Sequence, residues 1–167
     1  KAANFESALQ LLLDRKDPFD AEIVLTVQNI ISQIRKRGDA ALLEYTARFD
    51  GFDVNDAAQL EISPATLKHA FKEIPAKLRQ SLEQVARRVG LFHERQLEGS
   101  WQYDEEDGTR LGQRLTPLDR VGVYVPGGKA TYPSSVLMTA VPARIAGVRE
   151  IVMVVPSPGG EVNEAVL

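Results

Sequence analysis

The sequence of 167 residues predicts an α/β protein with a helical N-terminal region, residues 1–99, followed by a region of strands, residues 100–167. Apolar residues recur at helical spacing throughout the first region. The spacing then changes to alternation on either side of Asp107-Gly108, a pair typical of hairpin turns. After this hairpin come a strand pattern, a helix pattern and a second strand pattern, which together predict a βαβ unit with parallel strands.

Capping and terminating residues divide the helical region. Asp17 followed by Pro18 is typical of a helix start, and Asp39 and Ser63 are further candidate N-caps. Gly38 and Gly51 are suited to helix ends. The apolar stripe of each helix indicates a core-facing side. Helices are therefore expected at 4–16, 17–38, 39–51, 63–74 and 75–97, whereas 57–63 fits either a short strand or a loop.

The strand region begins with a β-hairpin over residues 100–117. A strand at 120–125, a helix at 134–148 and a strand at 150–156 follow, and 159–167 is expected to begin a further helix. Ser134 is the candidate cap of the first helix, and Pro142 inside it predicts a kink or an early break. The nearly continuous apolar run at 150–156 indicates a sheet covered on both faces.

Composition excludes several classes of function. A net charge of −3 and a pI near 5.5 argue against binding to nucleic acid through a broad basic face. The chain has no cysteine, so disulfides, thiolate chemistry and zinc sites built on sulfur are excluded. No apolar run approaches the ~18 residues of a membrane span. His69 and His93 fall on separate expected helices, without carboxylates at metal-ligand spacing. No catalytic residue and no metal ligand is predicted in this chain.

The most informative stretch is the break at Pro126-Gly127-Gly128, between the expected strand at 120–125 and the helix that follows. Ligands of parallel sheets bind at this end of a strand, and glycines there let the backbone approach a ligand closely. The spacing of Gly122 and Gly127 resembles a phosphate-binding P-loop, but Gly128 stands where that motif requires lysine. A tight turn whose glycines satisfy only its geometry is the alternative.

Tyr124 is the candidate binding residue beside this break. Strand alternation places its side chain on the face opposite to Val123 and Val125. Its ring could stack on a flat ligand and its hydroxyl could form a hydrogen bond, although a tyrosine packed in the sheet fits the pattern equally well.

Residues 117–156, "PLDRVGVYVPGGKATYPSSVLMTAVPARIAGVREIVMVVP", closely resemble histidinol dehydrogenase. The similarity extends upstream to "RKRGDAALLEYTARFDG" at 35–51, to "FHERQ" at 92–96, and to the hairpin with its following Thr116-Pro117. The resemblance covers essentially the whole chain.

This resemblance implies an enzyme that oxidises L-histidinol through L-histidinal to L-histidine, using two NAD molecules in succession and a bound zinc ion. It also implies a cytoplasmic homodimer and an incomplete Rossmann-like domain that begins within residues 100–167. The tyrosine that contacts NAD in the family matches Tyr124, with Gly127 and Gly128 as possible backbone neighbours. No residue of this chain matches the family's zinc ligands or its proton-transferring Glu-His pair.

We therefore expect the chain to be an N-terminal piece of such an enzyme and to be inactive alone. A related dehydrogenase acting on another amino alcohol or a sulfonated diol remains open, because the residues that set specificity are missing from the match. A non-catalytic interaction module is a third possibility.

Overall fold

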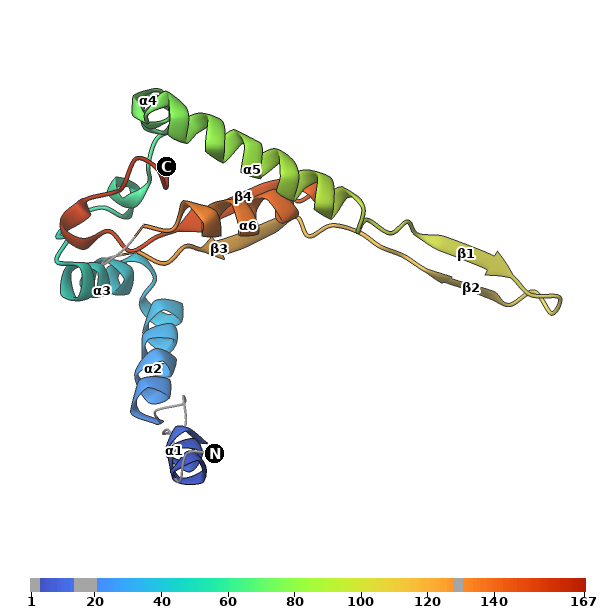
Figure 1. Ribbon diagram of the computed structural model, residues 1–167, viewed down its shortest axis with the longest axis horizontal. Helices are drawn as coiled ribbons and strands as arrows, with labels where there is room; N and C mark the ends of the chain where they lie inside the picture. The colour runs from blue at the N-terminus through green and yellow to red at the C-terminus, as the bar shows by residue number, and fades with distance from the viewer. Residues whose placement is uncertain (1–3, 14–20, 128–130) are drawn as a thin grey trace.

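The computed structural model describes residues 4–13, 21–127 and 131–167, and it has the α/β architecture that the sequence predicts (Figure 1). The parallel strands β3 and β4 lie beside helices α5 and α6, while the hairpin β1–β2 and helices α1 and α2 extend away from this body (Figure 1). None of the helices within these ranges is long and apolar enough to cross a membrane. The elements in chain order are α1 (Phe5–Leu13), α2 (Ala21–Arg37), α3 (Asp39–Asp50), η1 (Ala57–Leu60), α4 (Pro64–Glu73), α5 (Ala76–Glu94), β1 (Trp101–Asp104), β2 (Arg110–Gln113), β3 (Arg120–Tyr124), α6 (Pro133–Ile145), β4 (Glu150–Val154) and η2 (Pro158–Gly160).

The boundaries of the helices in the N-terminal region follow the expected capping chemistry except at the start of α3. Ser63 caps α4 as predicted, because its Oγ accepts a hydrogen bond from the Thr66 N–H at 3.1 Å. Gly38 and Gly51 separate α2, α3 and the following loop with φ angles of 58° and 62°, which L-residues rarely adopt. Asp39 is not a cap but the first residue of α3, since Gly38 occupies the cap position without a side-chain bond. The predicted start of α2 at Asp17-Pro18 lies outside the described residues.

Residues 57–60 form neither a strand nor a loop but a short 3₁₀ helix. Its start is a capping box: the Asp56 carboxylate accepts from the Ala58 N–H at 2.9 Å, and the Gln59 side chain accepts from the Asp56 N–H at 3.2 Å. The Asp-x-x-Gln spacing in the sequence is typical of such a capping box.

The hairpin β1–β2 is confirmed as an antiparallel pair that turns at Asp107-Gly108. Gly108 has a φ of 85°, and the Asp107 carboxylate accepts from the Thr109 N–H at 2.8 Å, which lowers the pKa of Asp107. All residues of both strands are exposed, so the hairpin is an arm and not part of the core.

Strands β3 and β4 pair in parallel from Arg120↔Glu150 to Tyr124↔Val154, which confirms the predicted strand pairing. Val123 and Val125 are buried, with Val125 fully inaccessible, whereas Val152 and Val154 remain 36% and 56% exposed. Within the described part of the chain, helices therefore cover only one face of this sheet, and the expected covering of the second face stays a prediction. The reason is that α6 packs on the sheet and α5 packs on α6, so these helices form successive layers on one side.

Gly90 lies where α5 meets α6. It is buried, and a Cβ atom at this position would stand 3.9 Å from Val141 Cγ1, at ordinary contact distance. The helix runs through Gly90 without interruption, and Phe92, one half-turn further on, is 62% exposed.

Helix α6 differs from its prediction at its start and at its internal proline. It begins at Pro133, so Ser134 lies inside the first turn and is not the cap. It also continues through Pro142 to Ile145, so the expected early break does not occur. Gly147 then ends it as predicted, with a φ of 87° and a hydrogen bond from the Val148 N–H to the Ala143 carbonyl at 3.1 Å.

The expected helix over 159–167 is absent from the structure. The chain instead forms η2 and then a single turn, in which Asn163 accepts a hydrogen bond from the Ala165 N–H at 2.9 Å. Gly159 and Gly160 have φ angles of 64° and 79°, a left-handed pair that no α-helix contains.

We predict that Ser63→Ala lowers the free energy of unfolding by about 1 kcal/mol, because it removes the cap of the first turn of α4. Ser81→Ala is the matched control. Ser81 lies inside α5 and donates to the Lys77 carbonyl, so alanine there should leave stability unchanged or slightly raised. Guanidinium denaturation followed by circular dichroism measures both, and equal effects would contradict the assignment of Ser63 as a cap.

Candidate functional site

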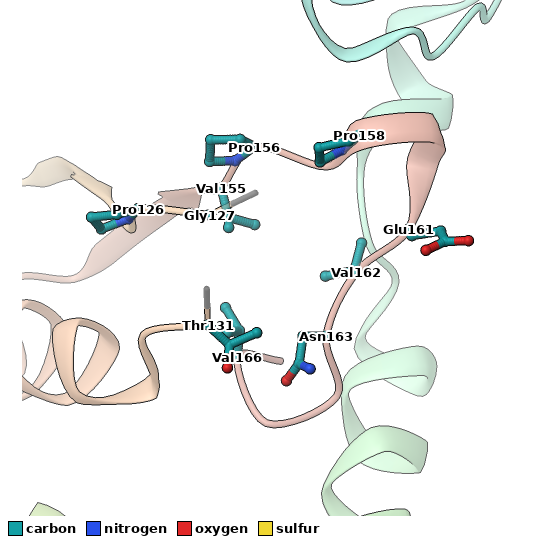
Figure 2. Close-up of a pocket in the computed structure, with 10 residues that line it drawn as sticks. All are labelled: Pro126, Gly127, Thr131, Val155, Pro156, Pro158, Glu161, Val162, Asn163 and Val166. Atoms are coloured by element: carbon teal, nitrogen blue, oxygen red, sulfur yellow. The ribbon is translucent and has the colours of Figure 1, made fainter. Parts of the chain in front are cut away.

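A pocket of about 280 Å³ lies beyond the carboxyl ends of β3 and β4 (Figure 2). This is the edge at which parallel sheets bind their ligands, because the connecting loops diverge there. The connection after β3 forms one wall, and the segment after β4 folds back to form the other (Figure 2). Its lining residues are Pro126, Gly127, Thr131, Val155, Pro156, Pro158, Glu161, Val162, Asn163 and Val166.

The two walls meet where the sheet pairing continues past β3. The Val125 N–H donates to the Val154 carbonyl at 3.0 Å, one residue beyond the end of the strand. Val125 is fully buried, and Val166, on the returning segment, is 4% exposed. Buried valines thus support the pocket on both sides.

Gly127 is required by the packing of these walls. A Cβ atom at this position would lie 2.9 Å from the Pro156 carbonyl oxygen and 3.2 Å from Val155 Cγ2. The first distance is shorter than real Cβ contacts, and a backbone atom cannot move aside easily. This supports the interpretation of Gly127 as a residue of a tight turn, while Gly128 lies outside the described residues.

Few polar side chains line the pocket. The Asn163 side-chain oxygen already accepts from the Ala165 N–H, so its amide group remains free to donate. Glu161 is exposed, and its carboxylate points away from the other lining side chains (Figure 2). Thr131 adds a hydroxyl. Among the described lining residues Glu161 alone can titrate, so the pocket is suited to binding and lacks a pair of groups for acid–base catalysis.

Tyr124 is the last residue of β3, and its side chain is 62% exposed on the open face of the sheet. The expected alternation is confirmed, because Val123 and Val125 are buried on the opposite face. Its partner in the register is Val154, which is also exposed. The structure therefore brings Tyr124 to the same end of the sheet as Gly127, but Tyr124 does not line the pocket.

No metal centre is formed by the part of the chain that the structure describes, since no three His, Cys, Asp or Glu residues gather there. His69 lies 3.9 Å from Glu73 on the surface of α4, and His93 lies edge-on to Phe92 on α5. A second hollow, of about 440 Å³, is lined by residues of α2 alone and brings no separate elements together.

Sequence reasoning missed the wall formed by Pro158, Glu161, Val162, Asn163 and Val166, because 159–167 was interpreted as a helix. The Pro158-Gly159-Gly160 triplet is the signal that could have found it. Proline followed by two glycines is typical of a turn, just as at Pro126-Gly127-Gly128.

Comparisons with known proteins match the chain to one family. Residues 13–167 match the family described as histidinol dehydrogenase. The chain is 55% identical over 163 residues to the histidinol dehydrogenase of Nitrosospira multiformis, covering 98% of this chain and 37% of that protein. The corresponding protein of Pseudomonas putida is 54% identical over 164 residues, again covering 98% and 37%.

A solved structure agrees with these matches. The crystal structure of histidinol dehydrogenase from Elizabethkingia anophelis superposes with a TM-score of 0.76 at 29% identity, covering 91% of this chain and 34% of that chain. The chain thus spans about 37% of the length of the curated relatives it matches.

We predict that Gly127→Ala lowers the free energy of unfolding by about 1–3 kcal/mol, because the added methyl group forces Pro156 away. Gly122→Ala, on the exposed face of β3, is the control. A Cβ there meets nothing within 4 Å, so this variant should be neutral or slightly stabilised. Urea denaturation measures the free energy of unfolding of both variants. Equal values would contradict the close contact between Gly127 and Pro156.

Proposed function

Because the chain belongs to the histidinol dehydrogenase family, we propose that it forms the N-terminal part of an enzyme that oxidises L-histidinol through L-histidinal to L-histidine. Each oxidation removes a hydride from the substrate carbon and a proton from the oxygen on that carbon, and NAD, when bound, would accept the hydride. Before the second oxidation the aldehyde adds water, which supplies the second oxygen of the carboxylate. We further propose that the enzyme is a cytoplasmic homodimer and contains zinc. The described residues offer no group that could hold this metal, so no zinc-dependent step is assigned to them.

The observation that carries the role of this chain is the exposed ring of Tyr124 at the carboxyl end of β3, the end of the sheet at which the pocket lies. A flat ring can stack on a nicotinamide or adenine base, and the phenol hydroxyl can donate to a ribose or phosphate oxygen. Gly127 lies at the same end of the sheet and shapes the turn that lines the pocket there. These features fit the edge of an NAD site, although they supply only a few of its contacts.

In this proposal, residues 100–167 contribute the opening of an incomplete Rossmann-like domain, which the parallel β3–α6–β4 unit resembles. Residues 1–99 have a supporting role, because α5 packs on α6. This chain binds and orients NAD, and other parts of the enzyme carry the proton transfers.

We predict that Tyr124→Ala in the full-length enzyme raises the KM for NAD about tenfold through loss of stacking. Tyr124→Phe keeps the ring and should raise this KM by only about twofold. The KM for L-histidinol should stay unchanged. Tyr103→Ala, on the exposed hairpin, is the control. Steady-state rates of NADH formation give the KM values for NAD and for L-histidinol of the wild-type enzyme and of each variant. An unchanged KM for NAD in Tyr124→Ala would refute the assignment.

We also predict that the isolated polypeptide 1–167 forms no NADH from L-histidinol, NAD and zinc, whereas the full-length enzyme does. The physical reason is that the pocket residues described here lack an acid–base pair and a metal site. Absorbance at the NADH band measures both reactions. Formation of NADH by the purified polypeptide would contradict the proposal that other parts of the enzyme carry the proton transfers.

A further inference from the structure

We propose that Phe52, in the helical region, is a positioning residue that holds the far wall of the pocket in place for NAD. This inference rests on the proposed function and deepens it. The part of the far wall that this proposal concerns is the segment 158–162, which follows β4 and turns back over the strand ends (Figure 2).

The wall contains two consecutive glycines in the left-handed region, Gly159 with a φ of 64° and Gly160 with a φ of 79°. Its backbone hydrogen bonds are local: the Gly160 N–H donates to the Ser157 carbonyl at 2.8 Å, and the Glu161 N–H donates to the Pro158 carbonyl at 3.2 Å. These bonds set the shape of the turn. They do not determine where the turn sits relative to the rest of the molecule, since both partners belong to the turn itself.

Phe52 supplies a contact that links the wall to a distant element. It directly follows Gly51, whose φ of 62° ends α3, and α3 lies beside η2 (Figure 1). The Phe52 ring lies against the Cα of Gly160 so closely that a Cβ there would stand 2.7 Å from Cε2 and 2.9 Å from Cδ2. The ring itself is half-buried.

Gly159 provides a control that distinguishes the effect of the Phe52 contact from the effect of backbone strain. Gly159 also has a left-handed φ, but a Cβ at Gly159 meets nothing within 4 Å. Alanine at Gly159 therefore introduces strain alone, whereas alanine at Gly160 introduces similar strain and a clash with Phe52. A difference between the two variants measures the contact with the ring.

A shift of the wall changes the width of the pocket without touching the groups that transfer protons. The effect should therefore appear in the KM for NAD and not in kcat. In the full-length enzyme, we expect Gly160→Ala to raise the KM for NAD about tenfold and Gly159→Ala by about twofold or less. Phe52→Ala should raise it about fivefold, Phe52→Leu less, and kcat should stay within about twofold in each variant.

The double variant Gly160→Ala/Phe52→Ala tests whether the two residues act through one contact. Removing the ring opens space for the new methyl group, so the KM for NAD of the double variant should not exceed that of Gly160→Ala alone. Hydrogen–deuterium exchange of the amides of residues 157–167 gives a readout that needs no turnover. Phe52→Ala should speed exchange there, while Gly159→Ala should have a smaller effect. Should Gly160→Ala fail to fold, Phe52→Ala and its partial rescue in Phe52→Leu still decide the question.

Equal KM values for the two glycine variants would overturn this inference, as would an unchanged KM for NAD in Phe52→Ala. Faster exchange without a change in that KM would also overturn it, because the wall would then move without affecting NAD. If the wild-type enzyme turns over normally in these experiments, such results leave the proposed function intact. A wild-type enzyme that forms no NADH from L-histidinol would instead refute the proposed function, and this inference with it.

Discussion

Parallel pairing of β3 with β4 organises the part of the chain that forms the pocket. It aligns Tyr124 with Val154 and continues through the bond from the Val125 N–H to the Val154 carbonyl, so both strands end at one edge. Parallel strands cannot be joined by a tight turn, and α6 must therefore cross over between them. The pocket lies at the edge where the two connections diverge, and the pairing brings Tyr124 and Gly127 to that edge.

Helices of this chain cover only one face of the sheet, so side chains on the other face are accessible to a ligand. Helix α6 packs on the sheet and α5 packs on α6, so Val123 and Val125 are buried. The opposite face keeps Tyr124, Val152 and Val154 accessible. An accessible tyrosine at a strand end is available to a flat ligand, whereas the same residue on the covered face would only fill the core. The family membership and this exposure together support a role in binding NAD.

The glycines of the site are explained by close packing against neighbouring atoms and not by a need for a flexible backbone. Gly127 is pressed by the Pro156 carbonyl, and Gly160 is pressed by the Phe52 ring. Both contacts join segments that are far apart in the sequence, and both shape the same pocket. The helical region is therefore not merely attached to the strands, since through Phe52 it reaches the wall of the proposed cofactor site.

Neighbouring residues are enough to predict the cap at Ser63, the hairpin turn at Asp107-Gly108 and the alternation around Tyr124, and a long matching stretch identifies the family. Tertiary packing is needed to establish which face of the sheet is covered, that residues after β4 fold back as a wall, and that Phe52 meets Gly160. Those outcomes depend on contacts between distant segments, and periodicity along the chain carries no information about which distant segment will provide the contact.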